Sequence, residues 1–140
     1  MRNMRVVTES HQLAIIINRR AADVYAYASD PGHLPEWAAG LAGSIDFVDG
    51  QWIADTSMGR IFVVMVGQNE FGVLDHFVTL PDGHMVYNPM RVTSIGESSE
   101  VVFSLRRETG MSDDVFAADV AAVRSDLVSL KTILERQAHN

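Results

Sequence analysis

Histidine is the side chain in this sequence best suited to acid–base chemistry near neutral pH, and strand periodicity places one histidine on an apolar face. That residue is His76, whose alternating neighbours are Leu74, Val78 and Leu80. This face is therefore expected to point inward. Two interpretations stay open for His76: a core histidine satisfied by backbone or a carboxylate, or a pocket group that hydrogen-bonds a ligand or transfers protons.

Asn88 is the second polar residue with apolar neighbours at strand spacing, between Val86 on one side and Met90 and Val92 on the other. A buried amide without a partner costs about 1–3 kcal/mol, so Asn88 is a candidate for hydrogen bonding to a ligand. Asp75 adjoins His76 but points the opposite way on a regular strand, so no acid–histidine dyad is expected without a bulge.

Other catalytic and cofactor-binding patterns are missing. The chain has no cysteine, so disulfides, thiolate nucleophiles and cysteine-based metal sites are excluded. The remaining histidines, none spaced to bind a metal from one helix face, are His11, His33, His84 and His139. Neither a glycine-rich phosphate loop nor a Gly-x-Ser-x-Gly segment occurs. We therefore expect no metal and no bound cofactor.

The composition predicts one globular domain over residues 1–140, since 47% of the residues are apolar and 21% are charged. The net charge of −7 repels phosphate backbones and anionic lipids, so neither nucleic acid nor a membrane is an expected partner. Apolar runs are too short to span a bilayer and no signal-peptide core follows the first residues. These features predict a cytoplasmic protein.

Periodicity and turn residues predict a strand, two short helices, six strands and one long helix. A strand is predicted at Leu13–Ile17 and a helix at Ala21–Ser29, ended by Asp30-Pro31-Gly32. Pro35 opens a second short helix through Trp37. The six further strands are Ile45–Val48, Trp52–Thr56, Arg60–Val66, Gly72–Leu80, Met85–Ser94 and Glu100–Arg107. Both faces of Arg60–Val66 are apolar, so its inward face stays open.

The last element carries a continuous apolar stripe at helical spacing. Its members are Phe116, Val120, Val123, Leu127, Leu130 and Leu134. Ser112 is the expected N-cap, and the following Asp113 and Asp114 favour the positive end of the helix dipole. A coiled coil is the alternative, but the stripe is short for one, and a helix lying across the sheet is preferred.

This order of elements resembles the START-like (SRPBCC, Bet v 1-like) superfamily, and in particular its bacterial polyketide cyclase/dehydrase-like members. The resemblance covers nearly the whole chain and is carried by the segments IIINRRAADVYAYASDP at residues 15–31, LPEW at 34–37 and FGVLDH at 71–76, with the final helix over 126–135. It implies an α+β helix-grip fold. In that fold a seven-stranded curved antiparallel sheet wraps the long C-terminal helix, with two short helices after the first strand.

The sheet and the helix stripe either close on each other completely or leave a cavity for a ligand. We expect a cavity that binds a small hydrophobic or aromatic molecule of lipid-, polyketide- or quinone-like character. The residues expected to contact the ligand are Trp37, Met65, His76, Asn88, Met90, Phe103, Val123 and Leu127. Trp37 is equally compatible with simply anchoring its short helix.

Whether the protein is an enzyme stays open at this point. The alternative function is a polyketide cyclase or dehydratase-type enzyme with His76 as general acid/base and Asn88 or Tyr87 holding a substrate oxygen. A third hypothesis is a module that acts on another protein, and a homodimer is compatible with the sequence. The identity of the ligand and the assembly state are not encoded in any feature of the sequence.

Overall fold

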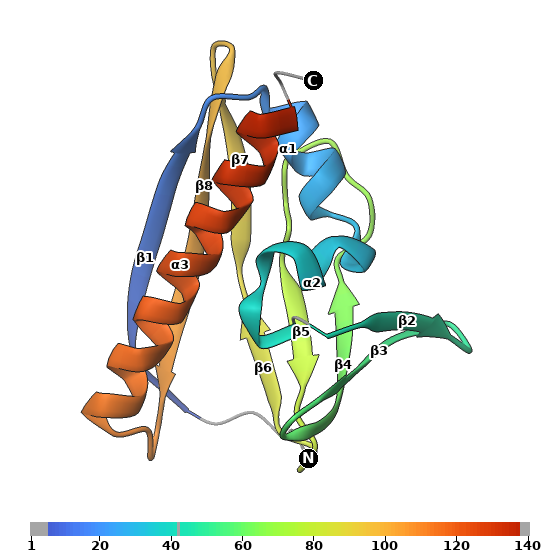
Figure 1. The fold of residues 1–140 in the computed structure, drawn as a ribbon. Helices are drawn as coiled ribbons and strands as arrows, with labels where there is room; N and C mark the ends of the chain where they lie inside the picture. Colours follow the sequence, from blue (N-terminus) through green and yellow to red (C-terminus); the bar gives the residue numbers. More distant parts are fainter. Residues whose placement is uncertain (1–5, 42, 138–140) are drawn as a thin grey trace.

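The computed structural model describes residues 6–41 and 43–137, which form an α+β fold of antiparallel strands and one long helix. The strands are β1 (Val7–Ile17), β2 (Ile45–Val48), β3 (Gln51–Thr56), β4 (Gly59–Met65), β5 (His76–Thr79), β6 (Met85–Asn88), β7 (Met90–Ile95) and β8 (Ser98–Glu108). The helices are α1 (Ala21–Ala28), α2 (Leu34–Trp37) and α3 (Asp113–Gln137), with 3-10 turns at Pro31–His33 and Ala39–Leu41. The long helix α3 crosses one side of the strands, and the short helices lie beside it (Figure 1).

The strands form two antiparallel sheets that meet between β5 and β7. Their orders are β1-β8-β7 and β2-β3-β4-β5-β6. Residues 72–74 connect the sheets, because the Leu74 amide donates to the Met90 carbonyl at 2.8 Å and the Val92 amide donates to the Gly72 carbonyl at 2.9 Å. The predicted strand Gly72–Leu80 therefore changes partner along its length, and only His76–Thr79 pairs with β4 and β6.

Pro89 divides the predicted strand Met85–Ser94 into β6 and β7. A proline has no amide hydrogen to donate to a ladder, so it interrupts a strand in the middle of a sheet. β6 pairs with β5, whereas β7 pairs with β8. The described residues therefore contain eight strands where seven were expected.

Gly72 lies in the segment that connects the two sheets. Its φ of +71° is disfavoured for residues with a side chain, and a Cβ at this position would lie 2.1 Å from the Val92 carbonyl oxygen. Only glycine fits this contact, which holds the segment before His76 in position.

Local signals set the ends of the other elements. Asp49 and Gly50 have positive φ values of 52° and 78° in the hairpin turn between β2 and β3, as the Asp-Gly pair predicts. The Ser112 hydroxyl accepts from the Val115 amide at 3.2 Å, which confirms the predicted N-cap of α3. The stripe of α3 packs on the sheet, with Phe116, Leu127, Leu130 and Leu134 all buried.

The open question about Arg60–Val66 is settled by burial. Ile61 and Val63 are buried and point toward α3, whereas Val64 is 60% exposed on the opposite face. Among the described helices, none combines the length and the apolar character that crossing a bilayer requires.

Candidate functional site

A cavity of about 300 Å³ lies between the sheet and α3, with α2 beside it. A volume of this size suits a small organic ligand. The sheet contributes Thr56, Ile61, Val63, His76, Val78, Asn88, Phe103 and Leu105, and the turns after β3 and β5 add Met58 and Leu80. The remaining lining residues are Leu34, Trp37, Ala38, Gly40, Leu41, Asp119, Ala122, Val123, Asp126 and Leu127. Complete closure of the helix on the sheet is thereby ruled out.

His76 is 8% exposed and lines this cavity. Its Nδ1 lies 3.0 Å from the Leu74 carbonyl oxygen. Because a carbonyl only accepts hydrogen bonds, Nδ1 carries the proton and Nε2 holds the lone pair. Burial lowers the pKa of His76, which keeps the ring neutral at neutral pH. Each nitrogen matches one of the two interpretations from the sequence. Nδ1 is satisfied by the backbone, as in a core histidine, and Nε2 remains as a hydrogen-bond acceptor for a ligand.

Asn88 lies directly opposite His76 in the antiparallel pairing of β5 and β6. Paired residues on one face of a sheet have Cβ atoms about 4.5–5.5 Å apart, so the two side chains are neighbours on the cavity wall. Within residues 6–41 and 43–137, no hydrogen bond involves the Asn88 side chain. Sequence periodicity alone predicted that these two polar residues would share the inward face.

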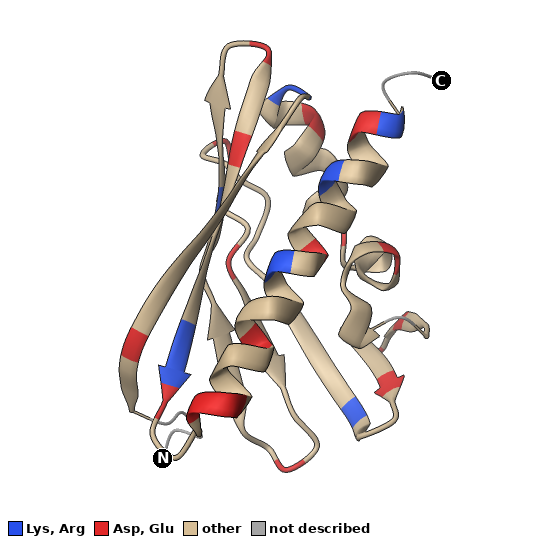
Figure 2. Ribbon diagram, turned by 60° about the vertical axis from the view of Figure 1, so that its left-hand side comes forward, with Lys and Arg blue, Asp and Glu red and all other residues tan. Residues whose placement is uncertain are grey.

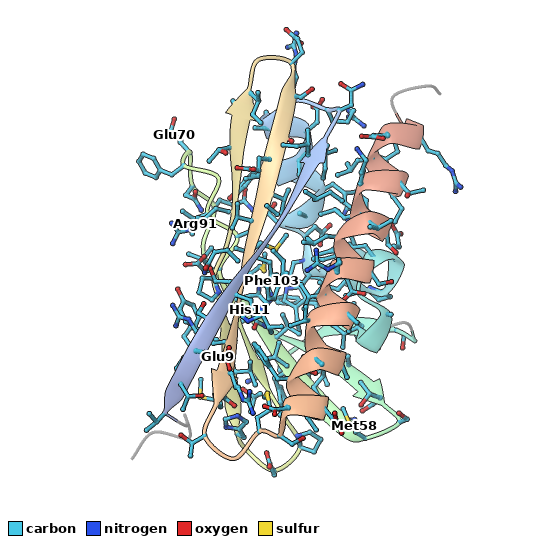
Figure 3. The ribbon with its side chains drawn as sticks, turned by 90° about the vertical axis from the view of Figure 1, so that its left-hand side faces the viewer. Glu9, His11, Met58, Glu70, Arg91 and Phe103 are labelled. Atoms are coloured by element: carbon cyan, nitrogen blue, oxygen red, sulfur yellow. The ribbon has the colours of Figure 1, made fainter. Side chains whose placement is uncertain are left out.

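Asp75 points to the outer face of the sheet, as strand alternation predicts. Its carboxylate accepts from the Tyr87 hydroxyl at 2.7 Å, the Met90 amide at 2.9 Å and the Arg91 guanidinium at 3.1 and 3.2 Å. Tyr87 is therefore held on the wrong face to bind an oxygen inside the cavity, and that part of the enzyme hypothesis is wrong. Figure 3 shows Phe103 in the space between the sheet and α3, with Arg91 on the outer side.

Six of the eight predicted contact residues line the cavity: Trp37, His76, Asn88, Phe103, Val123 and Leu127. Met65 and Met90 do not. Met90 is 1% exposed, so neighbouring core residues cover it completely. Met65 has the inward parity of β4 but lines a different groove, beside Trp52 and Val64.

Trp37 both anchors its short helix and forms part of the cavity wall. Trp37 is the last residue of α2, and its side chain is buried in the core and lines the cavity. Its indole Nε1 finds no acceptor in the described part of the chain and is itself covered. Trp37 therefore offers a ligand the flat apolar surface of its ring and no hydrogen bond.

Two carboxyl groups on α3 line the cavity, and sequence reasoning missed them. Asp119 and Asp126 are seven residues apart and share one face of α3 with Val123 and Leu127. Their spacing around Val123, by four and three residues, is the signal that could have identified them. Burial raises the pKa of both carboxyl groups. Figure 2 shows acidic positions spread along the length of α3.

Asp126 also connects α3 to the 3-10 turn Ala39–Leu41, part of which lines the cavity. Its Oδ1 accepts from the Ala39 amide at 3.1 Å, and this backbone bond lowers the pKa of Asp126 against the larger, raising effect of burial. Met58, in the turn between β3 and β4, also lines the cavity and is 76% exposed (Figure 3).

No group of three or more His, Cys, Asp or Glu side chains in the described ranges is arranged to hold a metal ion. The polar side chains of the cavity wall therefore supply one neutral imidazole, one amide, one hydroxyl and two carboxyl groups on a mostly apolar surface.

No family model matches the sequence, and no curated protein matches it. Several solved structures share its fold. XoxI from Bacillus cereus superposes with a TM-score of 0.73 at 14% identity, over 95% of this chain and 100% of that one. A START superfamily protein from Mycobacterium smegmatis gives 0.69 at 12% identity, over 93% and 99%. The Zhui aromatase/cyclase from Streptomyces sp. R1128 gives 0.66 at 11% identity, over 93% and 95%.

Structural likeness at identities this low establishes the fold, but it does not show that this chain shares the activity of any of these proteins. The likenesses extend over nearly the full length of both chains. They agree with the order of elements, in which a long C-terminal helix packs on antiparallel strands after two short helices. The resemblance predicted from the sequence is thus confirmed at the level of structure: the chain has the helix-grip fold of START-like proteins.

Proposed function

We propose that the protein binds a small hydrophobic or aromatic molecule in the cavity between the sheet and α3. The observation that carries the proposal is an apolar space of about 300 Å³ whose wall contains a buried histidine, and the Nε2 of that histidine bonds no group in the described part of the chain. Ligand sites are typically apolar with a few placed polar groups. A packing defect in an apolar core does not require polar side chains, whereas this wall carries both His76 and Asn88.

The fold supports the same proposal by analogy. A START superfamily protein and an aromatase/cyclase are among the structures with this fold. Because one fold hosts many functions, this likeness adds to the argument from the cavity and does not replace it.

The proposal is tested by measuring the melting temperature of the protein with a panel of polyketide-, sterol- and quinone-like compounds. A ligand at about 100 times its Kd stabilises the folded state by about 2.7 kcal/mol, which raises the melting temperature by several degrees. No stabilisation by any member of a chemically diverse panel would contradict the proposal.

A matched pair of variants locates the binding site. Val123→Phe adds an aromatic ring on the cavity wall, whereas Val128→Phe adds the same ring at an exposed position of α3. Overpacking costs about 1–3 kcal/mol, so the ligand-induced shift is measured against each variant's own melting temperature. We expect the shift to disappear in Val123→Phe and to persist in Val128→Phe. Equal shifts in both variants would place the ligand elsewhere.

The geometry of His76 favours a second candidate, an enzyme that removes a proton from a bound carbonyl compound. Leu74 holds the Nδ1 proton, so the neutral ring would act as a base through Nε2, and the Asn88 amide across the strand would hold the substrate oxygen. Exchange of the α-hydrogens of a bound ketone with deuterated water, followed by NMR, measures this activity. His76→Ala should slow exchange by about 100-fold while binding persists. Unchanged exchange would remove His76 from the mechanism.

A further inference from the structure

The carboxyl groups of Asp119 and Asp126 face a cavity whose described lining contains no basic side chain. Asp119 has no hydrogen bond or ion pair within the described ranges. Asp126 has only the amide of Ala39, at 3.1 Å. Seven helical residues correspond to a rise of about 10 Å, so the two carboxylates flank Val123 at separate places on the same wall.

The basic residues Lys131 and Arg124 of α3 do not line the cavity. Lys131 donates to the Ile16 carbonyl and to Glu135, both at 2.7 Å. Arg124 lies on a separate groove of α3, away from the cavity. None of the described residues that line the cavity is a lysine or an arginine. The net charge of the chain, −7, adds to the negative potential at this wall.

The polar groups of the cavity are mostly acceptors. His76 offers the Nε2 lone pair, because Leu74 holds its other nitrogen, and the two aspartates offer carboxylate oxygens. The Thr56 hydroxyl is already used, donating to the Gly59 carbonyl at 2.7 Å. Apart from the indole N–H of Trp37, which is covered, the amide of Asn88 is thus the one side-chain donor on the described wall that no protein group engages. A ligand that satisfies this wall must bring donors of its own.

We propose that the ligand of this cavity is a cationic amphiphile, an apolar ring system with a protonated amine that binds one of the two α3 carboxylates, and that apolar acids are rejected. This inference rests on the proposed function and specifies its ligand class. Burial disfavours the ionised form of both carboxyl groups, which raises their pKa, and a bound ammonium group removes that penalty. A carboxylate or phosphate on the ligand would meet like charge with no basic residue to offset it.

A trio of compounds with one apolar body and three head groups tests the inference. Naphthylethylamine, naphthylethanol and naphthylacetate are titrated into the protein at neutral pH by calorimetry. We expect the amine to bind about tenfold more tightly than the alcohol, as a charge-assisted hydrogen bond implies, and the acetate to bind most weakly. Acetate binding as tight as amine binding would overturn the inference.

Charge-removing variants assign the preference to the two aspartates. Asp119→Asn and Asp126→Asn keep the size of the side chain, and asparagine at 126 can still accept from Ala39. The double variant should bind amine and alcohol equally. Asp46→Asn, an exposed change of the same charge on β2, should keep the full amine preference. A preference that survives in the double variant, or that is lost in Asp46→Asn, would contradict the assignment.

One further measurement and the pattern of ligand binding show which part of the inference fails. Burial disfavours the charge of the two aspartates. Removing that charge should therefore leave the melting temperature of the ligand-free protein unchanged or higher. A large decrease would mean that the carboxylates stabilise the fold and do not serve ligand binding. If alcohol or acetate binds without an amine preference, only the ligand class is wrong. If neither the trio nor the broader panel binds, the proposed binding function fails as well.

Discussion

His76 makes the stability of the protein depend on pH in a way that can be calculated. The ring is 8% exposed, and burial lowers its pKa in the folded state, whereas a histidine in the unfolded chain has a pKa of about 6.5. Below that value the unfolded state binds a proton that the folded state does not. The contribution of His76 is therefore fully present above about pH 6.5 and is lost as the pH falls.

The size of this effect is limited by the uptake of one proton. The slope is at most about 1.4 kcal/mol per pH unit. Integrated from about pH 7.5 to about pH 5.5, the loss is at most about 1.4 kcal/mol, the limit for a ring that stays neutral throughout in the folded protein. Other groups add their own pH dependence, so the quantity to measure is the difference between the wild-type protein and a variant without this histidine.

Urea unfolding of wild type and His76→Gln at the two pH values gives that difference. Glutamine retains an N–H donor for Leu74 but does not titrate. We expect the variant to lose less than wild type over this interval, by up to about 1.4 kcal/mol. Phe103→Leu, a non-titrating change on the same wall, should lose as much as wild type. Equal losses in wild type and His76→Gln would refute the description of His76 as a buried neutral ring.

Three further predictions concern the framework of the site. Gly72→Ala should destabilise the protein by more than about 1 kcal/mol in urea unfolding, because the new Cβ meets the Val92 carbonyl at 2.1 Å and φ is +71°; a change within about 0.5 kcal/mol would show that the contact relaxes freely. Leu130→Ala removes a side chain with no exposure and should cost about 2–5 kcal/mol, against less than about 0.5 kcal/mol for exposed Val128→Ala; similar costs for both would contradict the packing of α3. Burial raises the pKa of Asp75, but its hydrogen bonds together lower that pKa below the usual value in the folded state. The contribution of Asp75 to stability is therefore present above the unfolded-state pKa of about 3.9 and is lost as the pH falls through the folded-state pKa. Asp75→Asn should therefore be less stable than wild type near neutral pH and nearly equal to it in acid, and a constant difference across the titration would contradict this.

Much of the site could be predicted from alternation along single strands. The side of a strand on which a residue lies is a local property, and a period of two placed His76 and Asn88 together on the inward face and Asp75 on the outer one. The helical period likewise identified the stripe of α3 that covers the sheet, including Leu127. None of these inferences needed to know how far apart the elements lie.

The errors concern properties that depend on neighbouring elements. Met90 has the predicted inward side chain, but core neighbours cover it, so the correct parity did not make it part of the wall. The break at Pro89 was visible in the sequence as a proline inside a strand. Its consequence, a change of pairing partner from β5 to β8, follows from the arrangement of the sheets.

The sequence by itself determined that His76 and Asn88 face inward, where the long helix begins and that no cysteine chemistry is available, because periodicity, capping and composition act over a few neighbouring residues. Only the tertiary structure decided that about 300 Å³ stays open between α3 and the sheet. It alone also brought Asp119 and Asp126 to the wall opposite the strand that carries His76. Cavity volume and the uncompensated charge of a carboxylate depend on distances between elements far apart in the chain, and no local pattern encodes those distances.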